Sequence, residues 1–157
     1  MTGMQRVKRS DTISLAALAD EVLCDLAPIA DQKQIKLSQS ETDCIVTGSY
    51  LLLYRAVFNL VENAIKYNHP DGSVHINITD ENGFALISIK DTGIGIAPEN
   101  QEKSLHLFSV LINQEAAQWR AGLGLALVAE IAQLHNGTVY VSESDSEGST
   151  IILKLPL

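Results

Sequence analysis

The sequence contains few aromatic residues and few cysteines. Aromatic residues make up 5% of the 157 residues, although hydrophobic residues of all kinds make up 46%. We therefore expect a single domain with an aliphatic core. The two cysteines, Cys24 and Cys44, have neither CxxC spacing nor a nearby histidine pair. This pattern favours two buried, reduced thiols over a zinc site or a disulfide.

Basic residues are also scarce. The chain has 11 Lys and Arg against 19 Asp and Glu, so its formal net charge is −8. Nucleic acids and anionic membranes bind clustered positive charge, so we expect neither partner. A small phosphate ligand is still compatible with this charge, because backbone amides and a metal ion can outweigh it locally. No secretory leader or long uncharged apolar run is visible, which predicts a cytoplasmic location without direct membrane contact in this fragment.

The hydrophobic pattern predicts alternating helices and strand pairs. We expect residues 1–11 to form a tail or linker and residues 12–157 to form one domain. The expected elements are a helix over Thr12–Ala30 capped by Asp11-Thr12, a hairpin of Ile35–Ser38 and Cys44–Thr47, a helix over Ser49–Tyr67, a hairpin around Asn82-Gly83, a lid over about 97–121, a helix from Gly122 to Asn136-Gly137, and strands Thr138–Ser142 and Thr150–Leu155. This order predicts an α+β two-layer sandwich: one mixed, mostly antiparallel sheet with helices packed on one face.

The expected helix Ser49–Tyr67 carries an unusual polar face. Asn59, Asn63 and Lys66 recur at steps of four and three residues, opposite an apolar stripe that includes Phe58 and Val61. Asparagine is unfavourable inside helices, because its amide competes for backbone hydrogen bonds. The face indicates either a binding surface for a polar, anionic ligand or a tolerated solvated face.

Two glycine-containing stretches follow a strand and open a helix. Asp91-Thr92-Gly93-Ile94-Gly95 follows an expected strand, where glycines allow close approach to a ligand. Gly122-Leu123-Gly124-Leu125 opens a helix, whose free N–H groups and dipole favour an anion. Either stretch alone is compatible with a plain turn or with close packing, and no Walker loop is present.

In combination and in this order, the stretches resemble the ATP-binding catalytic domain of sensor histidine kinases, within the gyrase and heat-shock-chaperone ATPase superfamily. Residues 59–67 are similar to that family's N box, Asp91–Gly95 to its first glycine box and Gly122–Leu125 to its second. The resemblance covers about residues 12–157. It implies the Bergerat fold and binding of ATP with Mg²⁺.

The resemblance also implies residue roles. Asn63 would bind Mg²⁺, Asn59 would face the phosphates as the candidate catalytic residue, and Lys66 would pair with a phosphate. Tyr67 would lie along the adenine or ribose, and Asp91 would bind the adenine amino group with Thr150 nearby. The remaining candidate ATP-binding residues are Gly93, Gly95, Ile96, Gly122, Leu123, Gly124 and Leu125.

Asn59 separates two activities within the superfamily. The gyrase-type ATPases have a glutamate at this position to activate water, and an amide cannot act as that base. The resemblance therefore implies a protein-histidine kinase domain, which transfers the γ-phosphoryl group to a histidine on a dimerisation domain absent from this chain. A response regulator would be an indirect partner, and the full protein would be a membrane-bound sensor. The alternatives are a non-catalytic regulatory nucleotide-binding domain, an ATPase or serine kinase of the same fold, and an interaction domain without a ligand.

The chain departs from the family pattern in three places. None of its four histidines lies in a convincing phosphoacceptor helix, so we expect no autophosphorylation by this fragment alone. The expected lid lacks the usual aromatic and arginine pattern after Phe108 and carries Trp119-Arg120 before the second glycine box. The last glycine box is reduced to Gly148-Ser149-Thr150.

Overall fold

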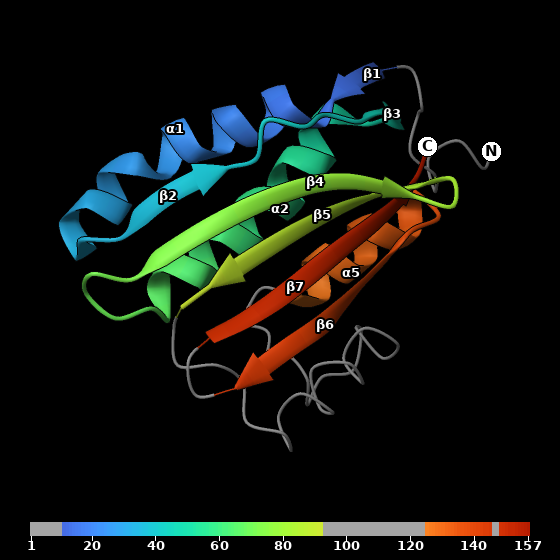
Figure 1. Cartoon of the computed structure of the whole chain (residues 1–157). Coiled ribbons are helices and arrows are strands. Elements are labelled where there is room, and N and C mark those ends of the chain that lie inside the picture. The colour runs from blue at the N-terminus through green and yellow to red at the C-terminus, as the bar shows by residue number, and fades with distance from the viewer. Residues whose placement is uncertain (1–10, 93–124, 146–147) are drawn as a thin grey trace.

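The computed structural model describes residues 11–92, 125–145 and 148–157, and its elements follow the expected alternation of helices and strands (Figure 1). The elements are β1 (Asp11–Ser14), α1 (Leu15–Lys33), β2 (Lys36–Gln39), β3 (Ile45–Gly48), α2 (Tyr50–Lys66), β4 (Ser73–Glu81), β5 (Phe84–Asp91), α5 (Leu125–Leu134), β6 (Thr138–Asp145) and β7 (Gly148–Pro156). None of these helices is long and apolar enough to span a membrane.

Within the described residues, the main sheet has five strands in the order β2-β4-β5-β7-β6. β2 pairs with β4 in parallel, and the other neighbouring strands are antiparallel. Helices α1, α2 and α5 cover one face of this sheet (Figure 1). The predicted α+β two-layer architecture is therefore confirmed.

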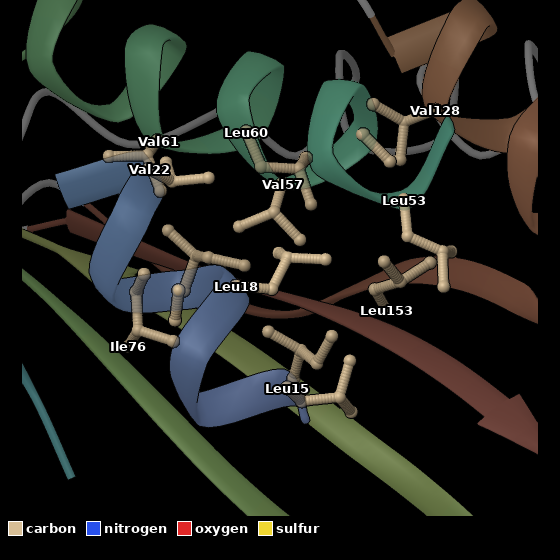
Figure 2. Packing of buried hydrophobic residues seen from close by; sticks show 14 of the residues in the cluster. Leu15, Leu18, Val22, Leu53, Val57, Leu60, Val61, Ile76, Val128 and Leu153 are labelled. Atoms are coloured by element: carbon tan, nitrogen blue, oxygen red, sulfur yellow. The ribbon is translucent and has the colours of Figure 1, made fainter. Parts of the chain in front are cut away.

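The core between the two layers is aliphatic, as the composition indicates. Leu18 and Val22 of α1 pack toward Val57 and Leu60 of α2, with Ile76 of β4 beneath them (Figure 2). All five side chains are at most 1% exposed. Burial of such side chains is the main force that holds helices on a sheet.

The predicted start of the first helix is wrong. β1 occupies Asp11–Ser14 and pairs with β3, and α1 begins only at Leu15. Ser14, not Asp11-Thr12, is the N-cap, and its hydroxyl accepts a hydrogen bond from the Ala17 N–H at 3.2 Å. Asp11 instead accepts from the Tyr50 N–H at 3.0 Å, at the start of α2. Pairing with a distant strand therefore overrides the helical pattern of this segment.

The predicted hairpin of Ile35–Ser38 and Cys44–Thr47 is also wrong. β2 joins the main sheet beside β4, whereas β3 and β1 form a separate two-stranded sheet. The two strands of the expected hairpin thus never pair. The expectation of a single sheet is corrected accordingly.

The later elements agree with the sequence analysis. Ser49 caps α2, and its hydroxyl accepts a hydrogen bond from the Leu52 N–H at 3.3 Å. Asn82 and Gly83 have positive φ angles of 52° and 85°, as a tight hairpin requires. Of the cysteines, Cys44 is buried as expected, but Cys24 is exposed, so the expectation of two buried thiols is half wrong.

Asp43 stabilises the start of α1 from the neighbouring loop. Its carboxylate accepts hydrogen bonds from the Ala16 N–H, the Ser14 hydroxyl and the Cys44 N–H at 2.8, 2.7 and 2.8 Å. Desolvation raises the pKa of Asp43, but these hydrogen bonds outweigh it and hold the pKa below its ordinary value. A carboxylate with a lowered pKa in the folded state contributes stability that is present above the unfolded pKa and is lost as the pH falls.

We expect Asp43→Asn to lower the free energy of unfolding at pH 7 by about 0.3–1 kcal/mol, because a negative charge beside a helix N-terminus is lost. The difference from the native chain should begin to shrink as the pH falls below about 4, the ordinary aspartate range, and should disappear only below the lowered pKa of the folded state. Denaturant unfolding at pH 7 and pH 3 measures this, with Asp20→Asn on the exposed side of α1 as the control. A difference as large at pH 3 as at pH 7 would contradict the assignment.

Candidate functional site

The polar face of α2 lies beside its buried stripe. Asn59 and Asn63 are half-buried and Lys66 is exposed, whereas Leu60 and Val61 are buried in the core. The Nδ2 atom of Asn63 is fully buried and, among the residues that the structure describes, has no hydrogen-bond partner. Buried polar atoms are rarely left unpaired unless a ligand, ion or water completes them. This amide therefore marks the face as more than a solvated surface.

The other edge of α2 packs against α1 through tyrosines. Tyr50, Tyr54 and Phe58 follow one another at steps of four residues, with ring centroids 6.3 and 5.8 Å apart. The hydroxyl of Tyr50 contacts Glu21, and that of Tyr54 contacts Asp25. Phe58 was expected on the buried stripe, but it is half-buried on this side of the helix.

Desolvation, together with the nearby carboxylates, raises the pKa of Tyr50 to about 12 and also raises that of Tyr54. Both phenols are therefore protonated at neutral pH and serve as donors. These contacts fix the position of α2, and with it the polar face, relative to α1.

The C-terminal end of α2 brings two predicted site residues together. Tyr67 is the C-cap residue of the helix, and the Lys66 ammonium lies 5.7 Å from the centroid of its ring. Lys33, at the end of α1, contacts the backbone carbonyl of Lys66. A cation next to helix C-terminal carbonyls is favourable, so Lys33 secures this end of α2.

Asp91 lies at the end of β5, on the face of the sheet that the helices cover. Its carboxylate accepts hydrogen bonds from the Ser149 hydroxyl at 2.9 Å and from the Ser149 N–H at 3.3 Å. Ser149 is 7% exposed. The carboxylate is thus held by Ser149 at the start of β7. This start of β7 lies at the same end of the sheet as the last turn of α2 (Figure 1).

The predicted place of Thr150 beside Asp91 is wrong. In the register of β5 and β7, Asp91 is opposite Ser149, and Thr150 is opposite Lys90. Successive residues of a strand point to opposite faces, so Thr150 lies on the face away from Asp91. Ser149 is the residue that the sequence analysis missed, and only knowledge of the strand register identifies it.

Helix α5 runs opposite to α2. His135, just after α5, is buried, and its Nε2 accepts a hydrogen bond from the N–H of Ser49, the N-cap of α2, at 3.1 Å. Its Nδ1 therefore carries the proton and donates to the Ile131 carbonyl at 2.8 Å. This histidine is structural, as expected. The start of α5 consequently lies toward the end of α2 that carries Lys66 and Tyr67 (Figure 1).

Several predicted site residues lie outside the described part of the chain. They are Gly93, Gly95, Ile96, Gly122, Leu123 and Gly124, together with the lid expected over about 97–121 and most of the tail expected over 1–11. Leu125 is the first residue of α5. Within residues 11–92, 125–145 and 148–157, no cluster of three or more His, Cys, Asp or Glu side chains is arranged to hold a metal ion. A metal at this site would depend on amide oxygens and on the ligand's own oxygens.

Comparisons with known proteins agree with this arrangement. The family described as Histidine kinase-, DNA gyrase B-, and HSP90-like ATPase matches residues 48–157. The chain is 32% identical to the sensor-like histidine kinase SenX3 of Mycolicibacterium smegmatis over 161 residues, covering 99% of this chain and 41% of that protein. It is 34% identical to the sensor histidine kinase RppB of Synechocystis over 146 residues, covering 89% of this chain and 32% of that protein.

The structure is similar to that of the mycobacterial sensor histidine kinase MprB, with a TM-score of 0.75 and 26% identity over 93% of this chain and 96% of that chain. The chain spans less than half the length of the curated relatives described above. The chain therefore belongs to the histidine kinase-, DNA gyrase B- and HSP90-like ATPase family, as an ATP-binding catalytic domain of the sensor histidine kinase type.

Proposed function

We propose that this domain binds ATP together with Mg²⁺ and holds it for transfer of the γ-phosphoryl group to a histidine on a dimerisation domain outside the chain. The observation that carries the proposal is the half-buried amide of Asn63, with a buried Nδ2 atom that has no partner among the described residues. Rotation of an amide by 180° exchanges its nitrogen and oxygen, so the same side chain can present an oxygen.

The residues present fit a magnesium ion. Asn63 would hold it through the amide oxygen, a hard ligand of the kind that Mg²⁺ prefers, and water and phosphate oxygens would complete its shell. The bound ion would neutralise charge on the phosphates. Lys66 lies one turn further along α2, where its exposed ammonium would pair with a phosphate oxygen.

The adenine base of ATP would lie between the end of α2 and the end of β5. Asp91 would accept a hydrogen bond from the adenine amino group, with Ser149 holding the carboxylate in place. Tyr67 would lie along the base or ribose. The roles of Gly93, Gly95 and Ile96, and of Gly122, Leu123, Gly124 and Leu125 as backbone phosphate contacts, belong to the same proposal.

Asn59 favours transfer to a protein nucleophile over hydrolysis. Its amide lies one turn before Asn63 and cannot remove a proton from water, so bound ATP would persist until the histidine of the partner domain arrives. Catalysis would then consist mainly of positioning and charge stabilisation. A response regulator would receive the phosphoryl group afterwards.

The test supplies a histidine-bearing dimerisation domain in trans with γ-labelled ATP and Mg²⁺. We expect acid-labile phosphohistidine only when both domains are present, and none with Asn59→Ala. Asn77→Ala, on the exposed face of β4, is the matched control and should transfer normally. ATP binding without phosphohistidine would support a regulatory nucleotide-binding domain instead, and rapid phosphate release by the chain alone would support an ATPase.

A further inference from the structure

A buried asparagine follows the polar face of α2. Asn68 is 5% exposed and comes directly after Tyr67. Its Nδ2 donates to the Ser73 carbonyl at 3.0 Å, and its Oδ1 accepts from the His69 N–H at 2.9 Å. A buried amide with these bonds specifies one local arrangement, because a displaced partner would leave a polar group unpaired.

The same amide reaches the residue after Asp91. The Thr92 hydroxyl donates to the Asn68 Oδ1 at 3.3 Å and accepts from the Ser73 N–H at 2.8 Å. The Thr92 N–H also donates to the Ser73 carbonyl at 3.2 Å. The side chains of Asn68 and Thr92, which are 24 residues apart, therefore join the end of α2 to the end of β5 together with the first residue of β4.

This joint, formed by Asn68, Ser73 and Thr92, is closely packed. A Cβ atom built on Gly72 would lie 2.1 Å from the Asn68 Oδ1 and 2.8 Å from the Thr92 Oγ1. Neither side chain can move toward Gly72, so their positions are defined by packing as well as by hydrogen bonds. Tyr67 and Asp91 are the immediate chain neighbours of the two joined residues.

We propose that Asn68 and Thr92 are positioning residues of the nucleotide site. In this role they act through their chain neighbours: they keep the carboxylate of Asp91 at a constant place relative to Tyr67 and Lys66. This inference rests on the proposed function, in which Asp91 recognises the amino group of adenine. A displacement of about 1 Å at such a site is enough to weaken recognition strongly.

The test compares ATP with ITP, whose base carries an oxygen in place of the amino group. The native 157-residue chain should bind ATP about tenfold or more tighter than ITP, because the carboxylate would face an oxygen acceptor in place of the amino donor. Thr92→Val, which keeps the shape but loses the hydroxyl, should bind ATP about three- to tenfold more weakly and lower the ATP/ITP ratio by a similar factor. Thr92→Ser should restore both the ATP affinity and the ATP/ITP ratio. Thr138→Val, at an exposed position of β6, is the matched control.

The results distinguish the proposed role of Asp91 in adenine recognition from the positioning role of Asn68 and Thr92. A native chain that binds ATP and ITP equally would overturn the proposed role of Asp91 itself. A native preference that Thr92→Val retains in full would overturn the positioning role while leaving Asp91 in place. Asn68→Ser removes the other half of the joint and must lower the ratio in the same way, so the test does not depend on the folding of one variant. Melting temperatures of all variants separate loss of selectivity from loss of fold.

Discussion

Replacing Asn63 by alanine should weaken Mg²⁺-dependent ATP binding by about 100-fold, a typical cost of disturbing a metal site. The physical reason is that Asn63, in the proposed site, would offer an amide oxygen to the ion, and alanine offers none. The stability of the fold should not decrease, because the Nδ2 atom is buried without a hydrogen-bond partner among the described residues. Removing an unsatisfied buried polar group relieves a penalty of about 1–3 kcal/mol, so the melting temperature should stay constant or rise.

Titration of a fluorescent ATP analogue with and without Mg²⁺ measures this effect, alongside thermal unfolding of the free protein. Asn77→Ala is the matched control, because Asn77 is exposed on β4 and lies on the face away from α2. The native chain and the control should bind more tightly when Mg²⁺ is added, and Asn63→Ala should not. Equal Mg²⁺ dependence in all three proteins would show that Asn63 is not the metal ligand.

Gly148→Ala should damage both the fold and the nucleotide site. Gly148 has a φ of 145°, and a Cβ atom there would lie 2.0 Å from the Asp91 carbonyl oxygen and 2.9 Å from the Thr92 Cα. The obstructing atoms belong to the backbone, so the clash can be relieved only by moving β7 away from the end of β5. We expect a loss of more than about 2 kcal/mol in the free energy of unfolding. ATP binding should weaken as well, because Ser149 would no longer hold Asp91.

Gly83→Ala separates backbone strain from the clash. Gly83 also has a positive φ, of 85°, but a Cβ atom there meets nothing within 4 Å. Its replacement should cost about 1 kcal/mol and leave ATP binding unchanged. Urea unfolding and analogue titration of both variants make the comparison. Similar losses at the two glycines would mean that the contact between β5 and β7 is less rigid than the geometry indicates.

Features that depend on interactions between residues close in the sequence were predicted correctly. Helix α2 was predicted over Ser49–Tyr67, within one residue of its observed ends, together with its buried stripe and its polar face, because helical periodicity acts over three or four residues. The hairpin at Asn82-Gly83 was predicted for the same reason. The chemistry proposed for Asn59, Asn63 and Lys66 depends only on this local pattern together with the family resemblance.

Features that depend on distant partners were predicted poorly. β2 and β3 read as a hairpin, yet they belong to different sheets, because β4 and β1 provide their partners. The first turn of the expected helix became β1 through the same pairing with β3. Nothing within either segment identifies those partners, so a purely local reading assigns the nearest one.

The sequence by itself determined the aliphatic core, the α+β class and the polar face of α2, since these follow from composition and periodicity. Only the tertiary structure decided which hydroxyl accompanies Asp91. The β5–β7 register puts Ser149 on that face and Thr150 on the opposite one, and a shift of a single residue would exchange them. The tertiary structure alone also revealed the joint between Asn68 and Thr92. A hydrogen bond between residues 24 positions apart in the sequence forms only when the end of α2 and the end of β5 meet at β4.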